Sequence, residues 1–250
     1  MAYTDHSFCW HGIVSTDPAA ARAFYTTALG WRAEAMQMGQ DTSTVLDPGD
    51  GVPRAHLGPP PESGVPSHWD SYLRVEDVDA ATAKAATNGG AVLVPPTDLP
   101  VGRFSVVTSP SGAAISLYRE ADPASTDAPG DAGVHWVELH SHELAADLAW
   151  LEATFGIGSD TMPMPTGPYH VLKQGERMVG GAMAAMQPGA PSMWLVWLMV
   201  DDVDARAASI REAGGNVLSE RMDVPGVGAM FVVADPTGGV FGIIQPPASA

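Results

Sequence analysis

Glu138 and His140 are the two side chains in this sequence whose types and spacing best suit proton transfer. They stand two residues apart in a run, 135–140, that alternates like a β-strand, so they share one face of it. A carboxylate and an imidazole buried together make an effective general acid–base pair. The alternative, of equal weight, is a salt-bridged pair at the rim of a cavity. His140 and His142 also form a metal-gripping His-x-His pattern, but their position beside Glu143 favours a solvated helix cap.

Asp70, Tyr72 and Arg74 form a second polar group with the same spacing, on one face of a predicted strand over 69–75. One interpretation is an internal ion pair beside a phenol. The other is the polar end of a ligand pocket, in which Arg74 receives an acidic or carbonyl group because its guanidinium presents several donors. The sequence leaves both interpretations open.

An internal repeat defines the elements that position these residues. The run 68–80 recurs at 193–205, with Trp69 answered by Trp194, and the match continues to the turns at 109–112 and 235–238. The offset stays at 125 or 126 residues throughout. A repeat of this length indicates how the chain is divided into structural units, but it does not indicate a chemical activity. The chain therefore contains two related halves, each large enough for a core of its own.

Each half contains two modules with the order strand–helix–strand–strand–strand. Apolar periodicity predicts the strands and helices, acidic residues precede the helices as N-caps, and glycines such as Gly30 and Gly89 end them. The four modules extend approximately over 8–57, 69–119, 135–183 and 194–245.

We expect two sequential domains, 1–120 and 134–250. The segment 121–133 is rich in small and polar residues and in proline, which is typical of a linker. Sequence alone leaves the pairing open. Modules one and two form one barrel and three and four the other, or module one pairs with four and two with three.

The composition excludes several classes of partner. A formal net charge of −17 repels phosphate backbones and anionic membrane surfaces, so we expect neither nucleic acid nor a membrane as a partner. A lone Cys9 excludes an intrachain disulfide, and no apolar run of membrane-spanning length occurs. We expect a cytoplasmic protein, monomeric or homodimeric, because the duplication supplies in one chain what single-domain relatives build as a dimer.

Two motifs carry a resemblance to a known family: the helix end Phe24-Tyr25 with Leu29-Gly30-Trp31, and the turn 235–238. They resemble the vicinal oxygen chelate superfamily, and in particular its tandem glyoxalase/bleomycin-resistance-like members, over 8–119 and 134–246. The resemblance implies an α+β fold in which four βαβββ units, here called modules, pair into two half-open eight-stranded barrels. It does not by itself imply the chemistry.

The resemblance also implies where metal ligands would stand: seven residues before each acidic cap, and in the last strand of a module. Those positions hold Trp10, Asp70, Trp136 and Leu195, and then Ser116 and Gly242. A divalent-metal site needs about three His or carboxylate ligands. The C-terminal half offers none at these positions, and the N-terminal half offers at most Asp70 and His56. We therefore expect no metal or other cofactor, with a divalent ion as the alternative that this ligand set disfavours.

Strand alternation places large side chains on the faces that the resemblance turns toward the cavities. They are Trp10, Trp136, Trp197 and Met199, joined by Tyr72 and Tyr118. Aromatic and Met-lined cavities suit flat or bulky apolar ligands that a few polar groups orient. The alternative is that these rings fill the barrels as core.

Two hypotheses about function follow. The first is a metal-free small-molecule-binding protein that holds an aromatic or apolar metabolite through Trp10, Asp70, Tyr72, Arg74, Tyr118, Trp136, Trp197 and Met199. The second is a glyoxalase-like lyase or isomerase, or another enzyme acting on a small carbonyl compound or specialised metabolite. It would use either a divalent ion or Glu138 and His140 as its catalytic pair. The sequence does not decide between binder and enzyme.

Overall fold

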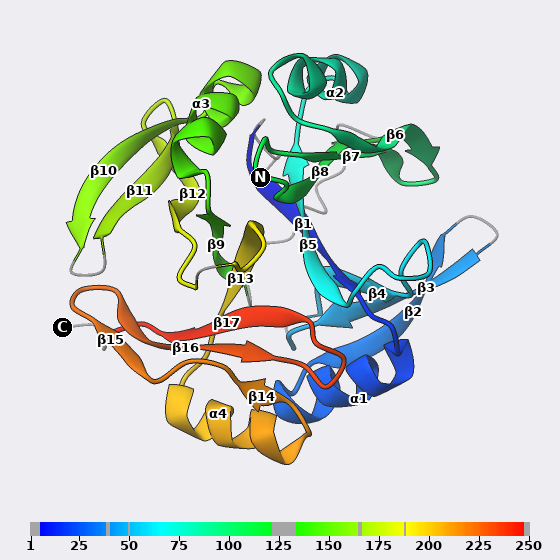
Figure 1. Ribbon diagram of the computed structural model, residues 1–250. Helices are drawn as coiled ribbons and strands as arrows, with labels where there is room; N and C mark the ends of the chain where they lie inside the picture. Colours follow the sequence, from blue (N-terminus) through cyan, green and yellow to red (C-terminus); the bar gives the residue numbers. More distant parts are fainter. Residues whose placement is uncertain are drawn as a thin grey trace. The chain divides into compact units, whose positions relative to one another are not determined.

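The computed structural model describes residues 6–38, 41–49, 51–121, 134–164, 167–187 and 189–247. The first two modules fold in the expected order (Figure 1). Module one consists of β1 (Phe8–Val14), α1 (Pro18–Ala28), β2 (Arg32–Met38), β3 (Asp41–Asp47) and β4 (Ala55–Gly58). Module two consists of β5 (His68–Arg74), α2 (Val78–Thr87), β6 (Val92–Leu99), β7 (Gly102–Thr108) and β8 (Ala114–Glu120).

The last two modules repeat this order with one departure. Module three consists of β9 (Val134–Ser141), α3 (Leu144–Phe155), β10 (Gly158–Met164), β11 (Gly167–Gln174) and β12 (Arg177–Ala184). Module four consists of β13 (Met193–Met199), α4 (Val203–Glu212), β14 (Asn216–Val217), β15 (Met222–Val224), β16 (Gly228–Ala234) and β17 (Val240–Gln245). Two short strands, β14 and β15, replace the single strand β6 of module two.

The helix caps agree with the prediction in three modules of four. Asp17, Asp77 and Asp202 each accept a hydrogen bond from the backbone N–H three residues on, which satisfies a free donor of the first turn. Glu143 occupies the same position before α3, but its side chain makes no capping bond. Ser141 Oγ instead accepts the Glu143 N–H at 3.0 Å.

None of the helices in the described part of the chain has the length and apolar character needed to span a membrane.

Two mixed sheets carry the modules. The first has the strand order β2-β3-β4-β1-β5-β8-β7-β6, and the second has β10-β11-β12-β9-β13-β17-β16-β14 with β15 paired to β16. Within each module the first strand pairs parallel with the last, as β1 does with β4 and β5 with β8. The α+β class and the half-open sheets are therefore confirmed. The sheets join modules one with two and three with four, and the second has nine strands instead of the expected eight.

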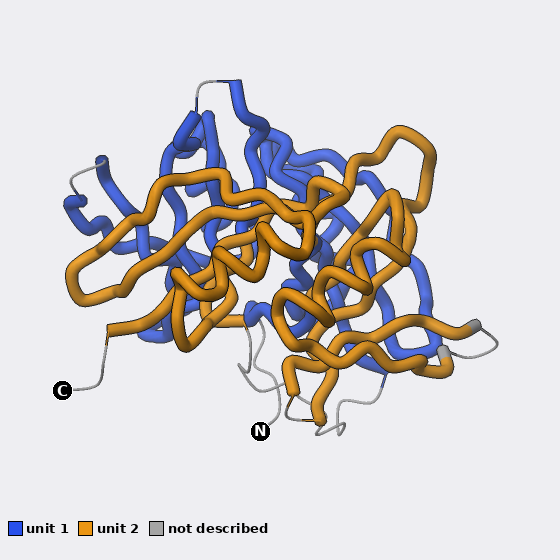
Figure 2. The backbone as a smooth tube through the Cα atoms, turned by 90° about the horizontal axis from the view of Figure 1, so that it is seen from below, with its two compact units in different colours: residues 1–10, 70–128, 137–195 blue, residues 11–69, 129–136, 196–250 orange. Residues whose placement is uncertain are grey.

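The compact units of the chain cut across these sheets (Figure 2). Unit 1 comprises 1–10, 70–128 and 137–195, and unit 2 comprises 11–69, 129–136 and 196–250. Unit 2 has a core that combines modules one and four, with α1 and α4 on the same side of it (Figure 1). Its buried members include Ile13, Phe24, Trp69, Val196, Leu198, Phe241 and Ile243.

This arrangement bears on the expected domains without testing them. The boundaries at 120 and 134 separate the two sheets, whereas each compact unit takes one module from each half. Of the proposed linker 121–133, residues 122–133 lie outside the described part of the chain. The division into two sequential domains therefore stays a prediction.

A buried polar chain crosses the core of unit 2. The Trp69 indole N–H donates to the Tyr25 hydroxyl at 2.9 Å, and that hydroxyl donates to Asp235 Oδ2 at 2.9 Å. Asp235 Oδ1 meanwhile accepts the backbone N–H groups of Thr237 and Gly239. The carboxylate thus holds the turn before β17 and joins it to helix α1.

In unit 1 the turn before β8 is also joined to a helix, but by different residues. At the positions one repeat away from Tyr25 and Asp235 stand Leu151 and Ser109. The carboxylate now comes from the helix, because Asp147 on α3 accepts the backbone N–H and the hydroxyl of Ser111 in the turn before β8. Trp194, the counterpart of Trp69, is buried with an indole N–H that has no partner in the described structure. One of the two repeated tryptophans has therefore lost its acceptor.

His11 is a buried histidine of unit 2 whose protonation should destabilise the fold. Burial lowers the pKa of His11 from 6.5 to about 3. The unfolded chain therefore binds this proton first, and we expect the free energy of unfolding to fall as the pH drops below about 6.5. Between pH 7 and pH 5 this site contributes a loss of about 2 kcal/mol.

Chemical denaturation of the wild type and of His11→Gln across this range measures the effect. The variant should lose stability less steeply by about that amount. Parallel pH profiles for the two proteins would contradict the assignment.

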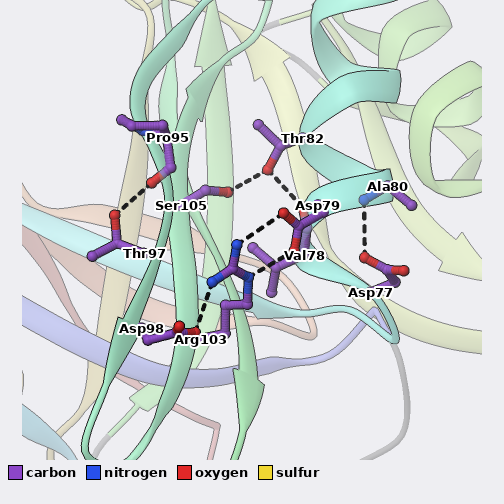
Figure 3. A network of polar contacts seen from close by, with 10 residues as sticks. All are labelled: Asp77, Val78, Asp79, Ala80, Thr82, Pro95, Thr97, Asp98, Arg103 and Ser105. Atoms are coloured by element: carbon purple, nitrogen blue, oxygen red, sulfur yellow. Dashed lines mark hydrogen bonds and ion pairs between the residues drawn. The ribbon is translucent and has the colours of Figure 1, made fainter.

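An arginine clasp fixes the β6–β7 hairpin to helix α2. Arg103 donates to both oxygens of Asp79 at 2.6 and 2.8 Å and to Asp98 at 2.7 Å, with Thr82 and Ser105 hydrogen-bonded beside it (Figure 3). In module four Arg221 binds Asp204 and Asp223, the repeat counterparts of the two aspartates. The arginine comes from a different position in each module, while the pair of aspartates is retained.

Candidate functional site

Strand β9 brings Glu138 and His140 to one face, as the alternation predicts. Nε2 of His140 lies 2.6 Å from Oε1 of Glu138, and the two residues are only 8% and 7% exposed. The second oxygen, Oε2, accepts the hydroxyl of Tyr169 at 2.7 Å. All three residues belong to unit 1. A buried carboxylate is therefore held between an imidazole and a phenol.

Tyr169 is the member that sequence reasoning missed. It lies on β11, and β12 separates that strand from β9. On β12 the residue paired with Glu138 is Gly181, so no side chain stands at that position between the two outer strands. Gly180 and Gly181 lie inside strand β12. Gly181 alone lies on the face of Glu138, and the missing side chain there is the signal in the sequence that points across the sheet.

His140 and His142 do not act together. Nδ1 of His142 lies 2.7 Å from Ser192 Oγ, and His142 is exposed while His140 is buried. Strand β9 ends at Ser141, so His142 lies beyond it and does not follow its alternation: Ser141 stays in the core and His142 reaches the surface. The two imidazoles thus have different partners, Glu138 and Ser192.

The polar group of module two is bonded internally. Ser116 Oγ on β8 donates to Asp70 Oδ2 at 2.7 Å, and burial together with the Asp70 charge raises the pKa of Tyr72 well above 10. Arg74 does not pair with Asp70. Its guanidinium binds Glu120 through Nε at 3.0 Å and Nη2 at 2.7 Å, and both side chains are largely buried. Arg74 was identified from the sequence as a candidate site residue, whereas nothing in the sequence indicated Glu120 as its partner.

Two tyrosines of module two lie together. The rings of Tyr72 and Tyr118 make an edge-to-face contact at 6.2 Å, and both residues are partly exposed. The Tyr118 hydroxyl donates to the carbonyl of Val101 at 2.7 Å. Burial raises the pKa of Tyr118 to about 12, so this phenol stays protonated at neutral pH. The pair offers aromatic surface with fixed hydroxyl groups.

The residues expected to line the cavities differ in exposure. Trp10 and Trp136 are partly buried, Trp197 is only 5% exposed, and Met199 is 48% exposed. Trp197 lies against the backbone of Gly242 on β17, its partner in the parallel pairing of β13 and β17. A methyl group at residue 242 would meet the indole ring at 2.1 Å. Glycine is therefore required under this ring.

The residues at the positions that the resemblance assigns to metal ligands do not fit a divalent ion. In module four the last-strand position is Gly242, covered by the Trp197 indole. In module two Asp70 accepts from Ser116, which stands at the corresponding last-strand position. Burial raises the pKa of the Cys9 thiol to about 12, which disfavours a thiolate ligand. Across the described residues, no group of three His, Cys, Asp or Glu side chains could hold a metal ion.

Several relatives match nearly the whole chain. A protein of Mycobacterium tuberculosis (strain CDC 1551 / Oshkosh), named "Putative glyoxylase CFP32", is 36% identical over 251 residues, which cover 95% of this chain and 94% of the relative. "Anthracycline biosynthesis protein DnrV" of Streptomyces peucetius is 31% identical over 265 residues, which cover 94% of this chain and 92% of the relative.

Solved structures share the fold. A Mn(II)-bound glyoxalase from Novosphingobium aromaticivorans matches with a TM-score of 0.63 at 16% identity, covering 98% of this chain and 83% of its own. A mutant of 4-hydroxymandelate synthase from Streptomyces coelicolor matches with a TM-score of 0.61 at 15% identity, covering 100% and 94%. At such identities the likeness concerns the fold alone. The profile of the Glyoxalase/Bleomycin resistance protein/Dioxygenase superfamily matches twice in succession, at residues 6–117 and 120–242, and the chain therefore belongs to that superfamily.

Proposed function

We propose that the chain is a metal-independent binding protein of the glyoxalase/bleomycin-resistance type that holds an aromatic metabolite. The observation that carries the proposal is the packing of Trp197 on Gly242, which puts an indole where the family places a carboxylate ligand. A buried aromatic ring over that position fills the space with carbon and leaves no metal donor there, which supports the metal-independent part of the proposal.

Two further observations support an aromatic ligand. Tyr72 and Tyr118 form a partly exposed pair whose hydroxyl groups are fixed by internal hydrogen bonds, and Trp10 is partly exposed as well. A relative that is 31% identical over nearly the full length is named for anthracycline biosynthesis, which concerns polycyclic aromatic compounds. Burial of Arg74 against Glu120 meanwhile removes the strongest cation of this group from ligand binding.

Fluorescence titration with a polycyclic aromatic probe tests the proposal. We expect 2-hydroxyanthraquinone to quench the tryptophan emission saturably, mass spectrometry to recover the probe unchanged, and elemental analysis to find far less than one divalent metal ion per chain. Tyr72→Ala should weaken binding by about twofold to tenfold, because stacking of this kind contributes about 0.5–1.5 kcal/mol. The exposed Glu152→Gln serves as the matched control. A metal content near one per chain, with binding abolished by a chelator, would overturn the metal-independent assignment.

The buried contact of Glu138 with His140 and Tyr169 favours a second candidate function, proton transfer without a metal. In that case Glu138→Gln should abolish turnover of a substrate and leave its affinity within about threefold, because the isosteric amide keeps the shape of the site. Glu152→Gln should change neither quantity. Loss of affinity equal to loss of turnover would argue against a catalytic role for Glu138.

A further inference from the structure

The hydrogen bonds of Glu138 determine which nitrogen of His140 carries the proton. An ionised carboxylate only accepts hydrogen bonds. Oε2 accepts the Tyr169 hydroxyl and Oε1 faces Nε2 of His140, so Nε2 carries the hydrogen. The imidazole is thereby held in one tautomer and one orientation, with its lone pair on Nδ1.

Nδ1 of His140 is the remaining polar atom of the cluster. Within the described part of the chain, it has no hydrogen-bond partner. Among the described residues, the polar side-chain atoms that are fully buried without a partner are Gln174 Oε1 and Trp194 Nε1, and Nδ1 of His140 is not one of them. Nδ1 therefore reaches accessible surface, although the residue as a whole is only 8% exposed. The ring is thus fixed through Nε2, and its Nδ1 lone pair is available for a hydrogen bond.

We propose that Nδ1 of His140 receives the proton of an acidic hydroxyl group on the bound ligand, a phenol or enol conjugated to a carbonyl. This rests on the proposed function, because it requires that the chain binds such a ligand. The ligand O–H bond breaks, its electron pair stays on the oxygen, and the proton forms the new N–H bond at Nδ1. The Nε2 hydrogen stays in place, and the positive charge of the imidazolium is balanced by the Glu138 carboxylate hydrogen-bonded to it. Glu138 and Tyr169 are positioning residues, and His140 touches the ligand.

Nitrogen-15 NMR of the histidine side chains tests the tautomer without any ligand. At pH 9, where imidazoles are generally neutral, the wild type should show the hydrogen of His140 on Nε2. The resonance is identified by its absence in His140→Gln. In Glu138→Gln the amide can present either its oxygen or its N–H group to Nε2, because the Tyr169 hydroxyl both donates and accepts, so the uniform preference for Nε2–H should be lost.

Two controls make this readout specific to the cluster. Tyr169→Phe leaves the Glu138 carboxylate in place, and a carboxylate only accepts, so His140 should keep its hydrogen on Nε2. Glu152→Gln should leave the wild-type tautomer in place. A wild-type His140 that carries its hydrogen on Nδ1 would overturn the proposal by itself, whether or not any variant folds.

A matched pair of probes tests the ligand chemistry. We expect wild-type protein to bind 2-hydroxyanthraquinone at least tenfold more tightly than 2-methoxyanthraquinone, and to shift the visible absorption of the hydroxy compound to that of its phenolate. His140→Gln should bind both compounds equally and leave the absorption unshifted. Equal binding of both probes by the wild type without a shift would overturn the proton transfer. If neither probe binds, the proposed binding of aromatic ligands fails, and with it the proton transfer, while the tautomer experiment separately decides the roles of Glu138 and Tyr169.

Discussion

Gly242→Ala should lower the free energy of unfolding by about 3 kcal/mol, at the upper end of what overpacking costs. The added methyl group would stand 2.1 Å from Cε3 of Trp197, well inside van der Waals contact, and the ring is held in the core at 5% exposure. A rigid indole cannot move aside as the end of a flexible side chain can. The result would establish that β17 needs a glycine to seat the ring.

A double-mutant cycle isolates this contact. Trp197→Ala alone should cost about 3–5 kcal/mol, because it removes a large buried ring. In that background Gly242→Ala should cost almost nothing, which gives a coupling energy of about 3 kcal/mol. Gly58→Ala is the matched control: it lies on β4 of the same unit, has no positive φ and meets no atom within 4 Å. Equal costs of Gly242→Ala in both backgrounds, measured by denaturant unfolding, would refute the packing argument.

The same contact shows which parts of the candidate site are predictable. Counting along the repeat places Gly242 at the last-strand position, and alternation places Trp197 on the facing side of the neighbouring strand. Neither rule says that one residue covers the other, because parallel register between β13 and β17 is set by tertiary packing. The glycine at that position can therefore be read from the sequence, whereas the ring that covers it cannot.

The ion pairs mark a second limit of prediction from sequence. Arg74 lies four residues from Asp70, yet it pairs with Glu120 across β5 and β8. Likewise Tyr169 reaches Glu138 from two strands away. Alternation identifies the face of a strand, and a face holds several candidate partners. Only the order of strands in the sheet selects among them.

The compact units show a third limit of prediction from sequence. All four helices present apolar faces, so any of them could cover any sheet, and periodicity contains no information about the partner. The crossed core of unit 2 is visible only in pairs such as Tyr25 of module one with Asp235 of module four. The corresponding residues one repeat away are Leu151 and Ser109. Both members of the contacting pair therefore differ between the two halves of the chain.

Tyr25→Phe should lower the free energy of unfolding by about 2–4 kcal/mol. The change removes one hydroxyl and leaves two buried groups, the Trp69 indole N–H and Asp235 Oδ2, without the partner that now joins them. Each such group costs about 1–3 kcal/mol, and more when it is charged. Trp194→Phe, on the counterpart of Trp69, removes an N–H that already lacks a partner, so it should cost no more than about 1 kcal/mol.

Alkaline unfolding gives this comparison a second, independent measurement. Burial and the neighbouring Asp235 charge raise the pKa of Tyr25 well above its ordinary value of 10. The unfolded chain therefore releases this proton first, and the wild type should lose stability as the pH rises above about 10. Tyr25→Phe should lose it less steeply, whereas Trp194→Phe should follow the wild-type profile. Equal costs of the two substitutions at pH 7, with the same alkaline slope, would mean that the polar chain of unit 2 contributes nothing that the simpler core of unit 1 lacks.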